Sequence, residues 1–477
     1  MPRPSSSLRF FRTSPATRTP HIELKAFYYY QLNDFMQAEE LRTFVNLYAT
    51  IWFTMSRIVI TGIGSVTPLG STFVDSWTAA RAGRTGIHPV SRITDFETSW
   101  VVCGEVKGFD PFNYLGDREV RRLDLFAQYA VSAAIMAAGD AGLTRQAKDE
   151  WLRAKGEQKC GPDDYLSSGG VIIGSSRGGI AMIEHALLKS ARMPKSRISP
   201  YLMPATTVSM AASYTAQKLG IEGHCLGISN ACASGTNAIG EAFRLIRSGY
   251  EGPVFAGGAD APICRICIQG YGVTGALSRR PDQTASRPFD KDRDGFVLSE
   301  GACVVVVERY ETAIKRGARI YAEISGYGST ADAFHQTRPQ PAGEARAMRS
   351  ALALAKKKPQ EIDFISAHGT STPRGDSAEA QAIQQVFGDH TPFIPVSAMK
   401  SMTGHMLAAS GAFETASAAM AIDQGLIFPT INLSAQDENI PLRVVRKATR
   451  ADIRTALINS FGFGGVNAVL VLQKRQG

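Results

Sequence analysis

The stretch GISNACASGTNAIGEAFRLIRSGY, residues Gly227–Tyr250, carries the strongest structural signal in the chain. An apolar strand end leads into Asn230-Ala231-Cys232, small residues follow, and apolar residues then recur with helical spacing. We therefore expect Cys232 at a helix N-terminus, where the helix dipole and free N–H groups favour a thiolate and can hold an oxyanion. A buried structural cysteine is the alternative interpretation, because most free cysteines are buried.

Outward from this stretch, short apolar runs alternate with helical patterns from Met55 onward. The expected strands are Arg57–Thr61, Gly170–Gly174, Val254–Gly257, Cys303–Glu308, Tyr321–Ser325, Phe364–Ala367, Phe393–Ser397 and Thr455–Asn459. The expected helices include Ala233–Ile246, Glu344–Ala355, Ala378–Phe387 and Gly411–Gln424. This alternation predicts a layered α/β fold. Each half of the sequence contains strands, a Gly-rich turn and an Ala-rich helix. This internal similarity alone does not establish a duplicated fold.

The bulk composition excludes several classes of function. The 477 residues are 44% hydrophobic and 20% charged, which fits a globular protein of two to three domains or one large duplicated fold. The net charge is +9, but no Lys/Arg run is interleaved with aromatic residues, so nucleic acid is a poor partner. An acidic protein or a phosphorylated carrier arm fits better. No apolar run approaches the roughly 18 residues of a membrane span, so no membrane role is expected.

Seven scattered cysteines argue against a disulfide framework and indicate a reducing compartment. Cys264 and Cys267 form a lone CxxC pair, which is weak evidence for zinc; two buried small residues are the simpler interpretation, and no metal site is predicted. Residues 1–20 contain Arg, Ser and Thr but no acid, like a transit peptide. Met55 nevertheless opens a self-sufficient start, so residues 1–54 are either removed or a wrongly assigned upstream start. We expect a cytoplasmic protein, or a plastid or mitochondrial one if the extension is a transit peptide.

Two histidines lie in loops rich in small residues. His368 ends a strand in SAHGTSTPRGD, residues Ser366–Asp376, and His405 follows a Gly turn in KSMTGHMLAASGA, residues Lys400–Ala412. Ligands bind at strand ends in α/β folds, so both are candidate site residues. The loop SFGFGGVN, Ser460–Asn467, suits a lid or a backbone oxyanion donor; a tight hairpin before the last strand is the alternative.

Five segments resemble the β-ketoacyl-[acyl-carrier-protein] synthases, in particular the elongating Cys-His-His type. They are NACASGTNAIG, SRPFDKDRDGFVLSEGA (Ser286–Ala302), AHGTSTPRGDSAEAQA (Ala367–Ala382), KSMTGH (Lys400–His405) and NSFGFGGVN (Asn459–Asn467). The resemblance runs from Met55 almost to the end of the chain. It implies a thiolase-like fold with five layers, α/β/α/β/α, built from two similar halves, residues 55–318 with the nucleophile and residues 319–477 with both histidines. It also implies a homodimer.

The resemblance assigns expected roles to single residues. Cys232 corresponds to the acylated nucleophile, His368 and His405 to the pair that acts in malonyl decarboxylation, and Lys400 to the lysine supporting His368. The N–H groups of Cys232 and Phe463 correspond to the oxyanion hole, and Phe463 to a gate. The remaining matches are Thr370 and Thr372 for the phosphopantetheine arm, Asp376 and Glu379 for stiffening the Lys400 network, and Arg118, Arg121, Arg122 and Arg279 for contact with the carrier protein. No tightly bound cofactor is implied, because the phosphopantetheine arrives on the acyl carrier protein.

The implied reaction is a decarboxylative Claisen condensation of an acyl thioester on Cys232 with malonyl-[acyl-carrier-protein] in fatty acid elongation. One departure concerns Arg177 in GSSRGG, Gly174–Gly179, where fatty-acid members place a small or aliphatic residue lining the acyl tunnel. Because a charge in an apolar tunnel is costly, either Arg177 turns outward across the dimer interface, which we favour, or the acyl chain is short or polar. Asn230 also occupies a position where members of this family commonly have Thr, and we draw no functional consequence from this difference.

Three rival functions share parts of this pattern. Degradative thiolases use a second cysteine near the C-terminus, whereas every cysteine here lies at or before Cys303. Silent chain-length partner subunits lose the nucleophile, which this chain keeps. A ketosynthase of polyketide or specialised lipid synthesis stays open, with Arg177 as its best support.

Overall fold

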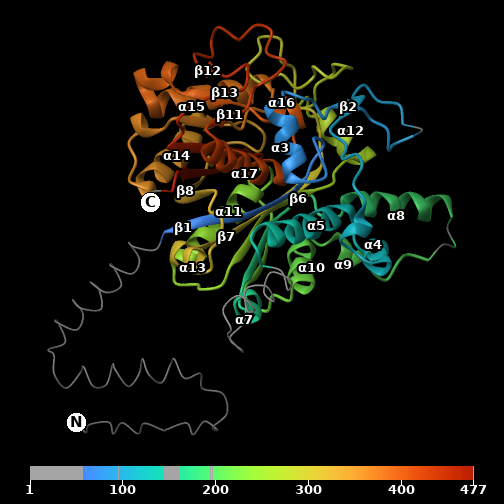
Figure 1. The fold of residues 1–477 in the computed structure, drawn as a ribbon. Coiled ribbons are helices and arrows are strands. Elements are labelled where there is room, and N and C mark those ends of the chain that lie inside the picture. Colours follow the sequence, from blue (N-terminus) through green and yellow to red (C-terminus); the bar gives the residue numbers. More distant parts are fainter. Residues whose placement is uncertain (1–56, 95, 144–161, 194, 196, 476–477) are drawn as a thin grey trace, which may run out of the picture. The chain divides into compact units, whose positions relative to one another are not determined.

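The structure is a computed structural model that describes residues 57–475 except residues 95, 144–161, 194 and 196 (Figure 1). The expected extension, residues 1–54, lies outside the described residues. A sheet of eleven strands runs through both halves of the described chain, in the order β12-β10-β9-β14-β15-β8-β1-β7-β6-β4-β5. Its strands are β1 (Ile58–Val66), β4 (Gly170–Gly174), β5 (Cys225–Ile228), β6 (Val254–Asp260), β7 (Gly301–Arg309), β8 (Ala322–Ala331), β9 (Phe364–Ser366), β10 (Pro395–Ser397), β12 (Arg443–Val444), β14 (Thr455–Gly462) and β15 (Val466–Gln473).

The strand pairing repeats itself along the chain. In the first half β1–β7 and β7–β6 are antiparallel, and β6–β4 and β4–β5 are parallel. In the second half β8–β15 and β15–β14 are antiparallel, and β14–β9 and β9–β10 are parallel. The two half-sheets join where Ile58–Ile60 of β1 pair with residues of β8. The expectation of two similar halves is confirmed by this repeated topology.

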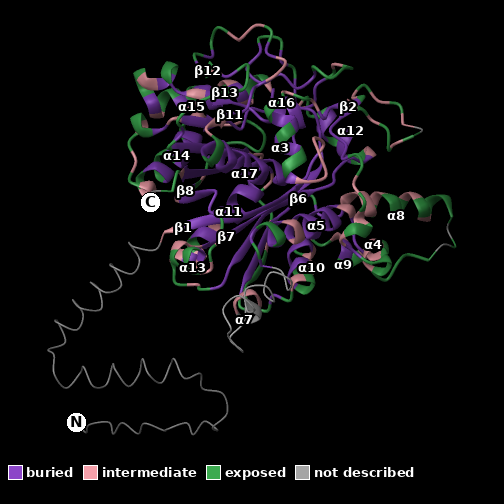
Figure 2. Cartoon of the chain, in the orientation of Figure 1, coloured by how far each residue is buried: buried purple, intermediate pink, exposed green. Residues whose placement is uncertain are grey.

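The helices complete five layers. They are α3 (Phe73–Arg81), α4 (Asp117–Arg122), α5 (Leu125–Asp140), α7 (Pro162–Ser167), α8 (Ile180–Arg192), α9 (Leu202–Thr206), α10 (Met210–Leu219), α11 (Ser234–Arg247), α12 (Arg265–Val273), α13 (Tyr310–Lys315), α14 (Pro341–Ala355), α15 (Pro373–Phe387), α16 (Lys400–Thr403) and α17 (Ala408–Gln424). Helices α11 and α17 pack against each other and contact both half-sheets, while α5 and α10 cover the first half-sheet and α14 covers the second, with α15 packed on α14. The order α/β/α/β/α is therefore confirmed, and the central layer is buried (Figure 2). Short strands β2 (His88–Pro89) with β3 (Val102–Cys103), and β11 (Leu426–Ile427) with β13 (Thr449–Arg450), form two small additional sheets.

Glycines let one helix lie unusually close to each half-sheet. A Cβ atom added at Gly62 or Gly64 of β1 would lie 2.3 or 2.0 Å from a backbone oxygen of α5. Gly326 and Gly328 of β8 meet α14 in the same way, at 2.2 and 2.1 Å. The first strand was expected to end at Thr61. It continues to Val66, because these glycines admit the helix and do not turn the chain.

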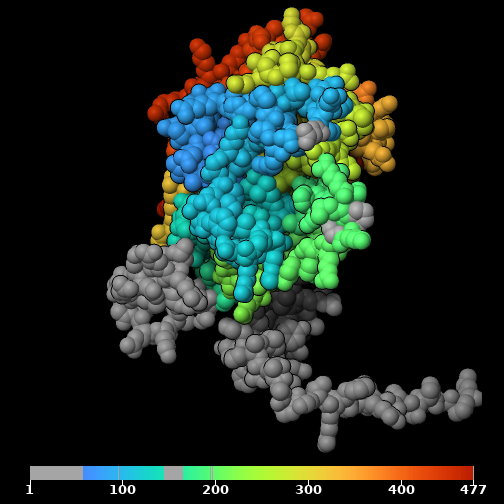
Figure 3. Space-filling view, turned by 90° about the vertical axis from the view of Figure 1, so that its right-hand side faces the viewer, coloured from blue at the N-terminus to red at the C-terminus, as the bar shows by residue number. Residues whose placement is uncertain are grey.

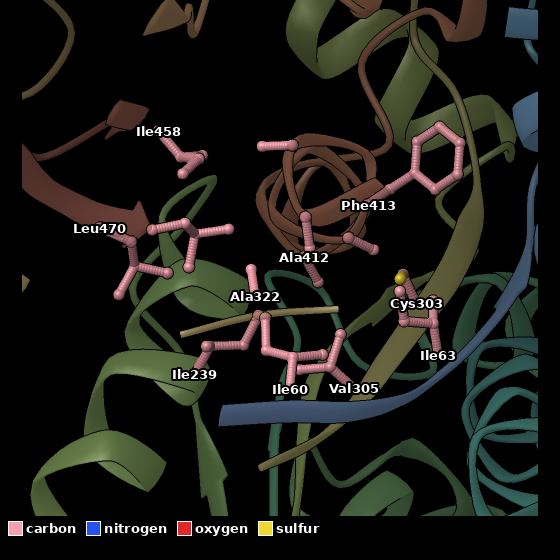
Figure 4. Close-up of a cluster of buried hydrophobic side chains, with 14 of the residues drawn as sticks. Ile60, Ile63, Ile239, Cys303, Val305, Ala322, Ala412, Phe413, Ile458 and Leu470 are labelled. Carbon is pink, nitrogen blue, oxygen red and sulfur yellow. The ribbon is translucent and has the colours of Figure 1, made fainter. Parts of the chain in front are cut away.

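The core lies around the central helix layer. Figure 4 shows Ile60 of β1, Ile239 of α11, Phe413 of α17 and Leu470 of β15 among the side chains of one buried cluster. Each buried side chain of this size stabilises the fold by about 1.5–3 kcal/mol. Among the described residues, no helix is both long and apolar enough to cross a membrane.

Candidate active site

Cys232 lies at a sharp turn between strand β5 and helix α11. The chain turns at Ala231, whose φ of 47° is in the left-handed region that residues with a Cβ rarely adopt. Ser234 Oγ holds this turn, because it accepts a hydrogen bond from Asn230 N at 2.8 Å and donates one to Ala231 O at 2.6 Å. The helix begins at Ser234, so Cys232 lies at its N-terminus as predicted.

The surroundings of Cys232 shift the pKa of its thiol in opposite directions. Burial raises the pKa of the Cys232 thiol to about 11, whereas the Lys400 charge and a hydrogen bond from the backbone N–H of Phe463 lower it. The resting group is therefore a thiol. Its proton must leave as it attacks, and the nearby positive charge and N–H donor favour the thiolate that forms.

His368 follows strand β9, and Glu379 and Lys400 orient it. Glu379 of helix α15 accepts the backbone N–H groups of His368 and Gly369, both at 2.8 Å. Lys400 Nζ lies 2.7 Å from the His368 carbonyl oxygen and 3.3 Å from its Nδ1. Since an ammonium group only donates, Nδ1 accepts, and the ring proton is assigned to Nε2.

His405 is oriented by a different set of contacts. It follows helix α16 and the turn residue Gly404, whose φ is 68°. His405 Nδ1 lies 3.2 Å from Ser410 Oγ, which already accepts the Met406 N–H at 2.9 Å. The hydroxyl hydrogen of Ser410 can therefore be donated to Nδ1, an arrangement that favours a proton on Nε2 in this ring as well.

The sulfur and the two imidazoles share one cavity. Cys232, His368 and His405 all line a space of about 350 Å³. The two rings stand at 85° with their centroids 5.4 Å apart. Burial holds the pKa of both histidines well below the usual range, and the Lys400 charge lowers it further. Both rings are therefore neutral at pH 7, and each can donate one N–H into the cavity.

Lys400 is fully enclosed, with 1% of its surface exposed. Besides His368, its Nζ contacts Glu414 Oε1 of helix α17 at 2.5 Å. Burial raises the pKa of Glu414 to about 7, while the Lys400 charge lowers it. A buried ammonium without a carboxylate partner is strongly destabilising. Glu414 is therefore the residue that permits a positive charge beside two neutral histidines.

Asp376 holds the loop that follows His368. Its carboxylate accepts the N–H groups of Phe289 at 2.8 Å and Ser371 at 3.0 Å, and Arg293 Nε lies 3.7 Å away. These contacts fix the loop that follows the first histidine. The expected part of Asp376 in stiffening the Lys400 network stays a prediction.

Phe463 lies in the turn between β14 and β15 and lines the cavity. Its N–H donates to the sulfur of Cys232, which is the position expected of an oxyanion donor, and its ring centroid lies 6.3 Å from that of Tyr271. Thr370 and Thr372 also line the cavity, with their hydroxyl oxygens 2.9 Å apart. The residues expected to meet the phosphopantetheine arm therefore line the cavity that contains the sulfur.

The four arginines expected to contact a carrier protein fall into two groups. Arg118 and Arg121 are exposed on helix α4, whose segment lies on the face shown in Figure 3, and the Arg122 guanidinium stacks 4.2 Å above the ring of Tyr201. Arg279 is exposed too, and its backbone N–H bonds Asp294, which lines the cavity. The helix α4 arginines do not line the cavity, whereas the exposed Arg279 directly adjoins it.

Arg177 combines the two orientations that the sequence left open. Its side chain is exposed in the single chain, yet its Nε donates to the hydroxyl of Tyr271 at 2.7 Å. Tyr271 lines the cavity with Cys232, and its ring packs edge-on against Phe296. The guanidinium therefore lies behind one wall of the cavity and bonds that wall.

Cys264 and Cys267, the CxxC pair, are both buried at the start of helix α12, in the same apolar cluster as Cys232. Within the part of the chain that the structure describes, no group of three or more His, Cys, Asp or Glu side chains is placed to hold a metal ion.

Sequence analysis missed two side chains that orient the histidines. Glu414 is the only charged residue in the buried run 408–422. A charge inside an otherwise apolar helix signals a buried partner, so this residue could have been found. Ser410 is one small residue among many at the same helix start, and nothing in its sequence context marks it.

Comparison with known proteins gives a consistent result. The family model "Beta-ketoacyl synthase, N-terminal domain" matches residues 55–313, and "Beta-ketoacyl synthase, C-terminal domain" matches residues 321–434. The 3-oxoacyl-[acyl-carrier-protein] synthase 2 of Synechocystis sp. is 41% identical over 425 residues, and that of Coxiella burnetii is 41% identical over 426 residues; each alignment covers 88% of this chain and 98% of the relative.

Solved structures show the same likeness. The ishigamide ketosynthase/chain length factor is 35% identical with a TM-score of 0.81, and a β-ketoacyl synthase from Burkholderia phymatum is 33% identical with a TM-score of 0.80. A chain in the structure of a type II polyketide synthase acyl-carrier protein in complex with its ketosynthase bound to the hexaketide is 32% identical, with a TM-score of 0.78. Each match covers 88% of this chain and 100% of the other.

Proposed function

The chain belongs to the β-ketoacyl synthase family, and on that premise we propose that it catalyses the decarboxylative condensation of an acyl thioester on Cys232 with malonyl-[acyl-carrier-protein] in fatty acid elongation. The observation that carries this proposal is the shared cavity, in which one sulfur faces two neutral imidazoles whose N–H groups are held at Nε2.

Cys232 takes part in the first half of the reaction. Its sulfur attacks the acyl thioester carbonyl, and the tetrahedral oxyanion is held by N–H donors at the helix N-terminus and at Phe463. The bond from the carbonyl carbon to the sulfur of the arm then breaks. The arm leaves as a thiol that carries away the proton given up by Cys232.

The two histidines act in the second half. The malonyl C–COO⁻ bond breaks, carbon dioxide leaves, and the electron pair moves to the thioester oxygen as an enolate. N–H groups of His368 and His405 stabilise that oxygen, since both rings are neutral donors. The enolate carbon attacks the acyl group on Cys232, and the Cys232 sulfur leaves as a thiolate. One proton taken up from solvent then restores the resting thiol.

A direct test is an elongation assay with purified protein, malonyl carrier and acyl carriers of graded length. We expect a β-ketoacyl carrier two carbons longer than the acyl donor, with one carbon dioxide released for each. An assay in which every donor is returned unchanged would argue against the proposed reaction.

Two partners belong to the proposal. An acyl carrier protein would deliver both thioesters on its phosphopantetheine arm, guided by the exposed arginines of α4 and by Arg279. A homodimer is supported by strand β5, which lies at the edge of the sheet with Cys225 and Leu226 exposed. An apolar strand edge of this kind is normally covered.

A second candidate function is a ketosynthase of polyketide or specialised lipid synthesis, and the Arg177–Tyr271 pair favours it. A phenol bonded to a guanidinium offers polar groups where a saturated chain gains nothing from them. We predict that Arg177→Ile shifts the preferred acyl carrier toward longer saturated chains. The graded assay above measures this, and an unchanged chain-length profile would remove the idea.

A further inference from the structure

A buried carboxyl group with one unpaired oxygen lines the cavity. Glu344 lies in the first turn of helix α14, is 1% exposed, and borders the same space as Cys232, His368 and His405. Its Oε2 atom has no hydrogen-bond partner among the described residues. Leaving a buried polar atom unpaired costs roughly 1–3 kcal/mol, so a retained carboxyl here indicates a partner that arrives with the substrate.

The two neighbouring acids differ from Glu344 because both have donors. Asp332 accepts Asn467 Nδ2 at 2.7 Å and Gln340 N at 3.0 Å, and Glu379 accepts two backbone N–H groups. Burial raises the pKa of Glu344 well above its usual range, and the charges of Glu379 and Asp332 raise it further. The helix dipole favours the charged form only modestly, so this position favours the protonated form of Glu344.

A protonated carboxyl group is a hydrogen-bond donor. The cations that line the same cavity, Arg338 and Arg374, are exposed, so they do not neutralise this buried position. An ionised Glu344 would repel the carboxylate of a malonyl group, whereas the neutral acid can bind a carbonyl oxygen. The cavity thus offers one buried O–H donor in addition to the two imidazoles.

We propose that the neutral carboxyl of Glu344 donates a hydrogen bond to a carbonyl oxygen of the incoming malonyl-phosphopantetheine, and so positions the thioester beneath His368 and His405. The proposal rests on the proposed function, since the same cavity must admit this arm. The acceptor is either the malonyl end or an amide of the arm, and both share the same carbonyl chemistry.

The test compares three variants with wild type in the elongation assay. Glu344→Ala should raise KM for malonyl carrier roughly tenfold, whereas Glu344→Gln, which keeps a donor of the same shape, should stay within about threefold. Glu311→Ala, at an exposed position on α13, serves as the matched control. Thermal unfolding of each variant separates loss of binding from loss of fold.

Two further measurements sharpen the outcome. KM of wild type should rise as the pH increases and Glu344 ionises, while Glu344→Gln should lack this rise; parallel pH profiles would overturn the inference even if Glu344→Ala does not fold. The second measurement uses a truncated malonyl thioester that lacks the arm. If Glu344→Ala still raises KM with this substrate, the acceptor is at the malonyl end, and if KM is unchanged, the acceptor is in the arm. An inactive wild type refutes the proposed function, whereas an active wild type matched by Glu344→Ala refutes only this inference.

Discussion

At the scale of single residues, the site depends on charges that burial would normally exclude. Lys400 gives its three donors to Glu414, the His368 carbonyl and His368 Nδ1. This fixes the ring tautomer, and the positive charge helps to keep His405 neutral as well. The ion pair thereby prepares two imidazoles as donors, although the pair itself need not stabilise the fold.

This account predicts how the pair responds to substitution. Glu414→Ala leaves a buried ammonium unpaired and should lower the free energy of unfolding by about 3–5 kcal/mol. The double variant Lys400→Met with Glu414→Leu removes both charges and should recover most of that stability without recovering condensation. Denaturant titration and the elongation assay measure the two effects. Recovery of both together would show that the charge is not needed to orient His368.

Much of the site could be predicted at this scale because its residues stand in distinctive small-residue loops. Cys232, His368 and His405 were each expected from their local sequence, and the cavity holds all three. Ser410 and Glu344 were not expected. Their importance comes from which atoms lie opposite them, and sequence spacing does not contain that information.

At the scale of elements, close approach explains where the expected strands and helices differ from the observed ones. The helix expected from Glu344 begins at Pro341, and the one expected from Gly411 begins at Ala408. Proline is favoured in the first turn, and small residues let α17 begin against α11, where a Cβ at Gly235 would lie 2.2 Å from the Ala408 oxygen. Helical periodicity does not detect such contacts, so each helix begins three residues before its expected start.

The glycines of β1 provide a test at this scale. Gly64→Ala would place a Cβ 2.0 Å from a backbone oxygen of α5, so strand and helix must separate, and we expect a loss of at least about 1–3 kcal/mol of unfolding free energy. Gly139→Ala is the matched control, because it lies on the exposed side of the same helix with no atom within 4 Å. It should be neutral or stabilising by up to about 1 kcal/mol. Equal effects of the two substitutions on denaturant unfolding would contradict the packing argument.

At the scale of the whole molecule, the duplicated fold brings the two halves of the site together. Helix α11 begins beside Cys232 in the first half, α17 begins just after His405 in the second, and they pack together between the half-sheets. Their first turns lie against each other, because a Cβ at Gly235 would lie 2.2 Å from the Ala408 oxygen. A fold of two similar halves thus places a nucleophile and a donor pair, far apart in sequence, in the same cavity.

The free energy of unfolding should depend on pH because the two histidines are neutral in the folded protein. Their pKa values are held below 6.5 in the folded protein, so between pH 6.5 and those lower values the unfolded chain binds more protons. Stability should therefore fall as the pH drops from 6.5, by up to about 1.4 kcal/mol per pH unit for each histidine. In His405→Gln that slope should be shallower, as measured by denaturant unfolding at pH 5, 6 and 7. Identical slopes would show that His405 is not held neutral.

The most direct measurement of the central claim follows the acyl group itself. Purified protein is loaded with acyl carrier, the free carrier is removed, and mass spectrometry locates the acyl group before and after malonyl carrier is added. We predict one acyl group on Cys232, which malonyl carrier then consumes with release of an equal amount of carbon dioxide. The variants His368→Gln and His405→Gln should still accept the acyl group, but they should release carbon dioxide roughly 100- to 1,000-fold more slowly. An acyl group found on another residue, or one on Cys232 that malonyl carrier leaves in place in the wild type, would contradict the account.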